Sequence, residues 1–369
     1  SFISGHRYNN LLGGIYCSYY EWYHDLPHVS SSMFGDQTEN CESSDWYLGT
    51  YWIVAGTNLN MTRTADAHFV SEAKYRGSKI VVLSPNYSDV TKYADTWVPL
   101  VPGSDGAFLM ACIHVILKEF YVDKKTPYFI EYSKQYTNLP FLVILEKDGD
   151  NYQMGRFLRA SDIEEYADEE NADWKLIMTD DQRKLHVPTG SIGFRWEKEP
   201  TGNWNLQLKN AVTNEEFDPH LTLLDNDDQK AMVSFSDFTD TFSIYIGKTK
   251  GKGQKAKEIL REVPAQKIKT KDGKELLVTT AFDLTMAQAG VARGLGGDYP
   301  QDYDDPKPYT PAWQEAQTGV SKDLAIQVGR EFAENAEKTK GKSLFITGPG
   351  IQHFYHGASL YYRNEAVML

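Results

Sequence analysis

The sequence predicts an α/β fold built around a parallel sheet. Compact apolar runs at 51–55, 79–84 and 96–100 alternate with helical patterns at the spacing of βαβ units. Each run leads into a turn rich in glycine or polar residues. A further apolar run, 343–347, stops in the same way at Gly348-Pro349-Gly350. Ligands of parallel sheets bind at the carboxyl ends of the strands, so these turns are the expected site.

The chain opens with a short predicted helix over 1–14 and then the aromatic stretch Tyr16–Pro27. Leu26 precedes a proline and is biased toward an extended backbone, so a helix arriving from Gly14 should end near Asp25. A carboxylate beside an aromatic wall needs a cation, a metal or hydrogen-bond donors. Local sequence alone favours a simpler interpretation, an aspartate in a tight turn.

A polar loop is expected over about 28–45, and such a long loop in a compact domain is usually functional. The α/β elements then follow one another: strand 51–55 leading into Gly56-Thr57-Asn58, helix about 64–76, strand 79–84 leading into Pro85-Asn86, short helix about 88–94, strand 96–100, and a long apolar helix that opens at Pro102-Gly103-Ser104-Asp105-Gly106 and continues through Phe120.

The pattern weakens between about 140 and 285, where short alternating runs predict a β-rich insertion. The runs are 141–145, 191–196, 204–208, 242–246 and 275–280. The basic tract Lys248–Lys257 could bind an anion, but a solvated loop is the favoured interpretation. Thr310-Pro311 marks the start of a helix over 310–336. We therefore expect three parts: an α/β domain at 1–140, a β-rich subdomain at 141–285 and a return to the α/β core at 286–369.

Composition excludes some function classes. The chain has 38 Lys plus Arg against 51 Asp plus Glu, for a net charge of −13. That balance disfavours nucleic acid or an anionic membrane as the main partner. Its three cysteines, Cys17, Cys41 and Cys112, form no CxxC pair, so a disulfide framework and a zinc ribbon are both disfavoured.

The glycine-bearing turns at 56–58, 103–106 and 348–350 suit phosphate or pyrophosphate groups, because backbone N–H groups make a ready anion site. None of them matches GxGxxG or a P-loop, so an ordinary dinucleotide dehydrogenase or NTPase is not supported. Two histidine pairs, His24/His28 and His353/His356, lack the HExxH spacing of a zinc protease. A serine hydrolase would lack its GxSxG elbow.

Several motifs together closely resemble the catalytic alpha subunits of membrane-bound respiratory nitrate reductase and of nitrite oxidoreductase. Both belong to the molybdopterin oxidoreductase (dimethyl sulfoxide reductase) superfamily. The resemblance covers essentially the whole chain, most specifically 1–120 and 305–369. Its motifs are Tyr20-Glu-Trp-Tyr-His-Asp-Leu-Pro27, Gly35-Asp-Gln-Thr38, Glu42-Ser-Ser-Asp-Trp-Tyr47, Gly56-Thr-Asn58, Thr62-Arg-Thr-Ala-Asp-Ala-His-Phe69, Pro102-Gly-Ser-Asp105, Thr189–Trp196, Tyr309–Trp313 and Gly348–His356.

The resemblance implies a Rossmann-like molybdopterin-binding core and a bis(molybdopterin guanine dinucleotide) cofactor with molybdenum. The family's aspartate ligand to molybdenum maps onto Asp25, and its active-site histidine maps onto His353. A hard, high-valent metal accepts carboxylate oxygen, which would also supply the partner that a desolvated Asp25 requires.

The remaining positions of the family's cofactor site also map onto this chain. Gly56, Thr57 and Asn58 match the turn around the pterin and phosphates, and Thr62 and Arg63 should lie close to it. Ser84, Pro85 and Asn86, together with Gly103, Ser104 and Asp105, fall where the family holds a guanosine end. Gly348 and Gly350 belong to the active-site turn before His353.

Two residues depart from the nitrate reductase pattern. His24 stands where a cysteine or another small residue is expected, and Gln352 stands where an asparagine is usual. Both changes affect the expected substrate funnel, so the direction of reaction and the preferred oxyanion stay open. The family's N-terminal motif for a [4Fe–4S] cluster is absent from this chain, and we expect the chain to be a fragment of a longer polypeptide that carries the cluster.

The expected function is two-electron oxygen-atom transfer between nitrate and nitrite. The expected partners are an iron–sulfur electron-transfer beta subunit and a haem-bearing gamma subunit. The enzyme would associate with a membrane through these subunits, and the sequence leaves open whether it lies on the cytoplasmic or the periplasmic face. An enzyme of the same type acting on chlorate, selenate or a hydrocarbon is the first alternative. A non-catalytic remnant of the fold is the second.

Overall fold

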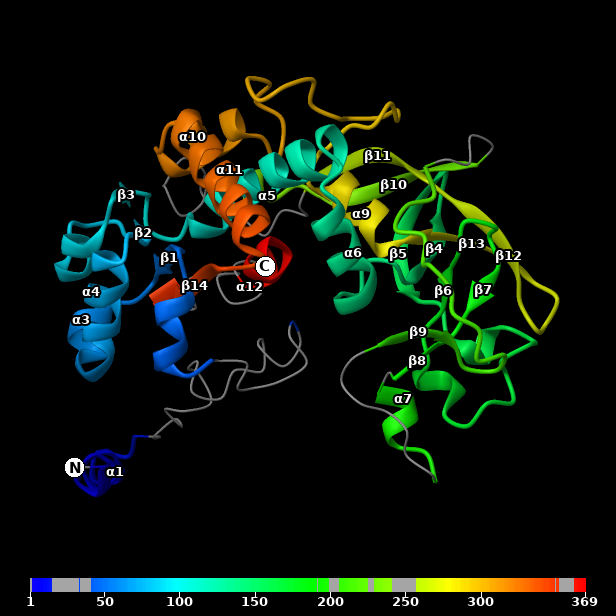
Figure 1. Cartoon of the computed structure of the whole chain (residues 1–369), viewed down its shortest axis with the longest axis horizontal. Helices are drawn as coiled ribbons and strands as arrows, with labels where there is room; N and C mark the ends of the chain where they lie inside the picture. The colour runs from blue at the N-terminus through cyan, green and yellow to red at the C-terminus, as the bar shows by residue number, and fades with distance from the viewer. Residues whose placement is uncertain are drawn as a thin grey trace. The chain divides into compact units, whose positions relative to one another are not determined.

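The computed structural model describes residues 2–14, 33, 41–190, 192–198, 206–224, 229–240, 257–348, 350–351 and 362–369. The chain divides into two compact units, one of residues 1–109 with 342–369 and one of residues 110–341 (Figure 1). Each unit is described by itself. The three-part division at 140 and 285 follows sequence pattern and stays a prediction.

The first unit contains a four-stranded sheet in the order β14 (Ser343–Thr347), β1 (Tyr51–Ala55), β2 (Lys79–Leu83) and β3 (Thr96–Val98). Every neighbouring pair is parallel. Figure 1 shows β14 beside β1, although the two strands come from opposite ends of the chain. The predicted α/β fold with a parallel sheet is therefore confirmed.

The two central strands, β1 and β2, are apolar because both faces of the sheet are covered there. All five residues of β1 are buried, as are the last four of β2. A hydrophobic core joins the sheet to the helices on one face. Its buried members are Trp46, Trp52, Val54, Leu59, Val70, Ala73, Ile80, Val82, Val90 and Ile346.

The first unit also contains short helices. They are α1 (Phe2–Leu11), the 3₁₀ helix η2 (Ser43–Leu48), α3 (Leu59–Thr62), η3 (Thr64–Asp66), α4 (Ala67–Tyr75), η4 (Asp89–Tyr93), the start of α5 (Asp105–Ile116) and α12 (Tyr362–Met368). The end of the expected polar loop is in fact η2. Its Trp46 is buried and packs edge-to-face on Trp52 at 6.1 Å, and this tertiary contact was not visible in the local polar composition.

The second unit is built on a six-stranded sheet in the order β11-β10-β5-β4-β13-β12. Its neighbours are antiparallel, apart from the parallel pair β10 and β5. The strands are β4 (Leu142–Asp148), β5 (Asn151–Phe157), β10 (Lys230–Ser236), β11 (Glu258–Pro264), β12 (Gln266–Lys269) and β13 (Glu275–Thr280). Two-stranded ribbons accompany it: β6 (Met178–Thr179) with β7 (Leu185–His186), and β8 (Pro188–Thr189) with β9 (Gln207–Asn210).

The helices of the second unit include the end of α5, the π-helical η5 (Leu117–Asp123), α6 (Pro127–Tyr136), η6 (Ala160–Asp162), η7 (Ala172–Trp174), α7 (Ile192–Arg195), α9 (Ala281–Gln288), α10 (Pro311–Thr318) and α11 (Lys322–Thr339). The segment expected to be helical over 310–336 forms two helices, α10 and α11. Gly319 ends α10 in a left-handed conformation (φ 74°), and the Ser321 hydroxyl caps α11. The apolar pattern continued across this break because both helices bury a face.

The run at 191–196 was expected to be a strand, and that prediction is wrong. Residues 192–195 form the helix α7, which buries Phe194 in the core of the second unit. Gly193 lets the helix backbone lie against the side chain of Lys175, because a Cβ at position 193 would be only 2.8 Å from Cγ of Lys175. The run at 242–246 lies outside the described residues.

The carboxylate of Asp283 lies at the centre of a buried hydrogen-bond network in the second unit. Its side chain is fully buried, and its two oxygens accept hydrogen bonds from Thr222 Oγ1, the Leu223 amide, Thr280 Oγ1 and Arg293 Nη1. The Arg293 contact is an ion pair of 2.8 Å whose arginine side chain is 5% exposed. These bonds tie the start of α9 to the segment before β10.

Replacing Asp283 by alanine is expected to destabilise the second unit by about 3–5 kcal/mol, because Arg293 is left as an uncompensated buried charge. The urea midpoint from pulse proteolysis would measure the loss. Asp123→Ala is the control, because Asp123 and Lys118 form an exposed pair that should contribute at most about 1 kcal/mol. Equal midpoints for the two variants would contradict the prediction.

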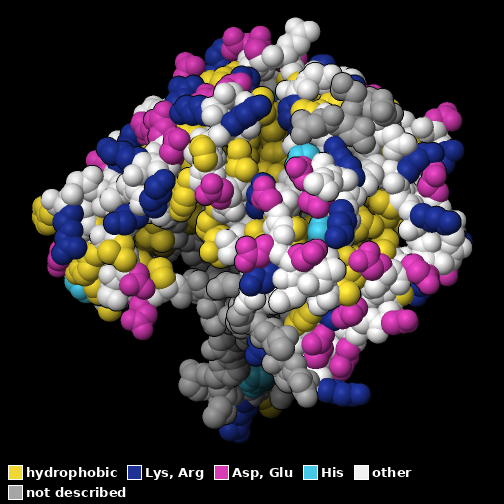
Figure 2. Space-filling model, turned by 45° about the vertical axis from the view of Figure 1, so that its right-hand side comes forward, with side chains coloured by type: hydrophobic (Ala, Val, Ile, Leu, Met, Phe, Trp, Pro, Cys, Tyr) yellow, Lys and Arg dark blue, Asp and Glu magenta, His cyan; other side chains and the backbone are white. Residues whose placement is uncertain are grey.

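Acidic and basic side chains are interspersed over the face that Figure 2 shows, with hydrophobic side chains visible between them. Within the described ranges, no helix combines the length and the apolar character needed to cross a bilayer.

Candidate functional site

The carboxyl ends of the parallel strands meet at one edge of the first unit's sheet. Ala55 of β1 pairs with Thr347 of β14 on one side and with Leu83 of β2 on the other. The residues that follow these three, Gly56, Gly348 and Ser84, therefore begin neighbouring turns. The structure thus brings together turns that the sequence placed at three separate positions.

The turns after β1 and β14 are packed backbone against backbone. The Gly348 amide donates to Ala55 O at 2.9 Å, and the Gly350 amide donates to Gly56 O at 3.2 Å. A Cβ on Gly348 would lie 2.4 Å from Thr57 Cβ, and Gly56 has a positive φ of 65°. Only glycine fits both requirements, so the glycines expected to hold phosphate also hold the two turns together.

The turn after β1 leaves several polar groups available. Thr57 Oγ1 lies 3.3 Å from Thr62 Oγ1, and the Thr62 hydroxyl and amide both reach Asn58 O. Within the part of the chain that the structure describes, the Thr57 and Asn58 amides have no acceptor and the exposed Arg63 guanidinium has no partner. Two backbone donors and one free cation are suited to a phosphate.

Asn58 joins this turn to the next strand's turn. Its Oδ1 accepts a hydrogen bond from the Val90 amide at 3.0 Å, at the start of η4. In the turn after β2, the buried Ser84 hydroxyl donates to Asn86 O at 2.8 Å and lies 3.2 Å from Asn86 Oδ1. Pro85 and Asn86 are exposed. The hydrogen bond from Val90 to Asn58 therefore joins the turn after β1 to the segment that follows β2.

The third predicted turn opens α5. Gly103 has a positive φ of 84°, and the buried Ser104 hydroxyl donates to Val101 O at 2.6 Å. Asp105 is the first residue of α5 and is 7% exposed. Burial raises the pKa of the Asp105 carboxyl to about 6. An acid so desolvated is suited to pairing with a ligand's N–H donors.

Two residues of α12 belong to the same unit and were missed from the sequence. Asn364 is fully buried: its Nδ2 donates to Gly106 O at 3.0 Å, and its Oδ1 has no partner among the described residues. Glu365 is buried and both of its oxygens accept from the Thr347 hydroxyl. The signal was the Asn364-Glu365 pair directly before the apolar residues Ala366–Met368 of the same helix.

The predicted catalytic residues, Asp25 and His353, lie outside the described residues, as do His24 and Gln352. The histidine pairs considered for zinc do so as well. Across the described ranges, no three His, Cys, Asp or Glu side chains gather closely enough to hold a metal ion. The assignment of Asp25 as the molybdenum ligand therefore rests on the sequence.

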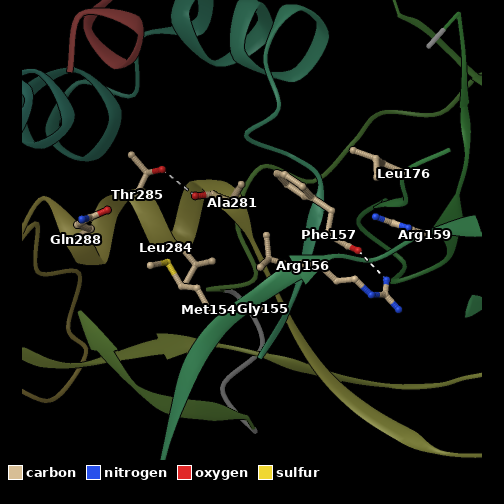
Figure 3. Close-up of a pocket in the computed structure, with 11 residues that line it drawn as sticks. Met154, Gly155, Arg156, Phe157, Arg159, Leu176, Ala281, Leu284, Thr285 and Gln288 are labelled. Atoms are coloured by element: carbon tan, nitrogen blue, oxygen red, sulfur yellow. Dashed lines mark hydrogen bonds between the residues drawn. The ribbon is translucent and has the colours of Figure 1, made fainter. Parts of the chain in front are cut away.

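The second unit contains a cavity of about 400 Å³ between β5 and α9. Figure 3 shows Met154 of β5 next to Leu284 of α9, and Arg156 hydrogen-bonded to the Phe157 carbonyl. Arg156 also forms a two-bond ion pair with Asp162. The cavity is largely apolar, and it contains none of the predicted site residues.

The strand-end residues fit a nucleotide-type cofactor. The glycine contacts leave no room for side chains between the turns, and the free amides and Arg63 supply donors for phosphate. Asp105 and the unpartnered Asn364 Oδ1 supply buried acceptors for ligand N–H groups.

Comparison with known proteins identifies the family of the chain. The family model described as Molybdopterin oxidoreductase matches residues 1–367. The nitrate reductase alpha chain of Bacillus subtilis is 42% identical over 362 residues, which cover 98% of this chain and 28% of that protein. The respiratory nitrate reductase 1 alpha chain of Escherichia coli is 41% identical over 96% of this chain and 28% of its own length.

A more distant relative is the perchlorate reductase subunit alpha of Dechloromonas aromatica, 26% identical over 96% of this chain and 31% of that protein. The chain thus spans about a third or less of the length of these curated relatives. The resemblance to nitrate reductase alpha chains expected from the motifs is confirmed. With a family match over nearly its whole length, the chain belongs to the molybdopterin oxidoreductase family.

Proposed function

We propose that this chain is part of the catalytic subunit of a molybdenum enzyme that reduces nitrate to nitrite by two-electron oxygen-atom transfer. The observation that carries the proposal is the 41–42% identity to nitrate reductase alpha chains along almost all of this chain. The reverse reaction, nitrite oxidation, uses the same chemistry and is the second direction to test.

Molybdenum, when bound, supplies the two-electron redox change and a Lewis acid for the oxyanion. Asp25 would ligate the metal through a carboxylate oxygen. His353 would bind the oxyanion or hold one of the two protons that the reaction consumes as nitrate is reduced to nitrite and water. The aromatic side chains of Tyr16–Pro27 would exclude water around Asp25, which strengthens every electrostatic contact of that carboxylate.

The cofactor would be bis(molybdopterin guanine dinucleotide). The turn Gly56–Asn58, with Thr62 and Arg63, would bind pyrophosphate, and the Gly348–Gly350 turn would hold that turn in place. Ser84–Asn86 and Gly103–Asp105 would bind guanosine. Asp105 has the chemistry for guanine, whose neighbouring N–H groups match a carboxylate. This pairing would stabilise the ionised acid and lower its pKa from about 6.

Electrons would come from an iron–sulfur beta subunit through a [4Fe–4S] cluster in the full-length catalytic subunit. A haem-bearing gamma subunit would connect the assembly to the membrane. These partners are proposed from the kinship with a respiratory nitrate reductase alpha chain.

The direct test is to purify the native protein and measure molybdenum together with turnover of nitrate, nitrite and chlorate using a redox dye. We expect about one molybdenum per polypeptide and nitrate reduction with a reduced viologen. A protein that contains molybdenum but prefers chlorate would favour the perchlorate reductase type of activity. Near-absence of molybdenum would overturn the proposal in favour of a non-catalytic remnant.

A further inference from the structure

Tyr87 is an exposed aromatic residue in the turn that follows β2. Its side chain is 69% exposed, although the strand before it is buried. It follows Ser84, Pro85 and Asn86 directly, at the carboxyl edge of the first unit's sheet. An aromatic ring left open at the ligand-binding edge of a parallel sheet is positioned to contact a ligand.

The Tyr87 ring is held in place from one side. It packs edge-to-face against Trp97 of β3, with ring centroids 5.2 Å apart and an angle of 90° between planes. Trp97 is itself fixed, because its indole N–H donates to Ser84 O at 2.9 Å. The Ser84 hydroxyl in turn holds Asn86. Tyr87 is therefore a supported ring with most of its surface open to solvent.

The surface next to Tyr87 is the proposed phosphate turn. The bond from the Val90 amide to Asn58 Oδ1 joins the segment that contains Tyr87 to the turn at Gly56–Asn58. In the proposed complex, a nucleotide with its phosphates on that turn would place its base beside the segment after β2. The amide of Asn86 is exposed beside it, and its Nδ2 has no partner among the described residues.

We propose that Tyr87 is the platform on which the purine base of the nucleotide cofactor stacks, with Trp97 as its support. The inference rests on the proposed nucleotide cofactor and extends it to a positioning residue. Stacking on an aromatic face contributes to affinity for any base and adds nothing to the affinity for phosphate. Removing the Tyr87 ring should therefore lower the affinity for the base and leave the affinity for phosphate unchanged.

The test uses the full-length polypeptide purified without its cofactor from a host that cannot make molybdopterin. Isothermal titration measures two probes, guanosine diphosphate and inorganic pyrophosphate. Tyr87→Ala should weaken guanosine diphosphate binding roughly five- to hundredfold and leave pyrophosphate binding unchanged. Tyr87→Phe should restore the affinity for guanosine diphosphate.

The matched control is Tyr75→Ala. Tyr75 ends α4, before the turn that leads into β2, so it belongs to the opposite edge of the same sheet, and it is 90% exposed. It should change neither affinity. If wild-type protein binds neither probe, both the nucleotide cofactor and this inference are overturned.

Two further outcomes overturn the role of Tyr87 alone. If wild-type protein binds guanosine diphosphate and Tyr87→Ala binds it equally well, the base does not stack there and the cofactor proposal stands. If Tyr87→Ala weakens both probes to the same extent, Tyr87 supports the shape of the turn and does not contact the base.

Discussion

Replacing Asp25 by alanine is expected to abolish nitrate and nitrite turnover while the fold stays intact. The proposed role of this carboxylate is to ligate molybdenum, and alanine offers no oxygen to a hard metal. A ligand removed from the reacting metal changes the chemistry itself, so we expect a loss of at least about a thousandfold, on the scale of other residues that act on the transition state. Dye-linked nitrate reduction, per molybdenum bound, measures it.

The comparison with His353→Ala makes this prediction specific. His353 is proposed to act on the oxyanion or its proton, so its loss should lower turnover while molybdenum content stays at the wild-type level. Asp25→Glu is the conservative variant, and it should retain more activity than Asp25→Ala because a carboxylate oxygen remains. Wild-type turnover by Asp25→Ala would refute the ligand assignment.

Replacing Gly348 by alanine is expected to displace the turn after β14 and to release the nucleotide cofactor. The added Cβ would lie 2.4 Å from Thr57 Cβ and 2.5 Å from Gly56 O. Neither neighbour is the flexible end of a side chain, so backbone must move, at a cost of about 1–3 kcal/mol. The moved backbone is the proposed phosphate turn. Molybdenum and acid-released guanosine monophosphate, per polypeptide, are the measurements.

Gly77→Ala is the control for this variant. Gly77 has a positive φ of 93°, so alanine is strained there, but its Cβ would meet nothing within 4 Å. It lies between α4 and β2, at the edge of the sheet away from the proposed site. Some loss of stability with full cofactor content is expected. A Gly348→Ala protein with full cofactor content would show that the contact between the two turns is not needed to bind the cofactor.

Prediction from sequence was most successful where local pattern and tertiary environment agree. The strands over 51–55 and 79–83 are apolar because both faces of the sheet are covered there, and their apolar runs are therefore continuous. The turns after strands β1 and β14 contain glycine because backbone meets backbone there, at Gly56 and Gly348. Both features leave a local record in the sequence.

The prediction of a strand at 191–196 failed for the opposite reason. Alternation of Ile192, Phe194 and their neighbours fits a strand, but the segment is a helix in which Gly193 packs against Lys175. That contact joins residues distant in sequence, and no local propensity records it. The break at Gly319 was missed because helical periodicity continues on both sides of it.

The sequence by itself determined the family resemblance, the parallel sheet, the phosphate-type turns and the proposed roles of Asp25 and His353. Only the tertiary structure decided which strand lies beside which, so that Gly56 meets Gly348 and Asn58 reaches Val90. It also revealed the buried Asn364 and the supported ring of Tyr87. The reason is physical: burial and contact depend on neighbours brought together by folding, whereas a motif depends on spacing along the chain.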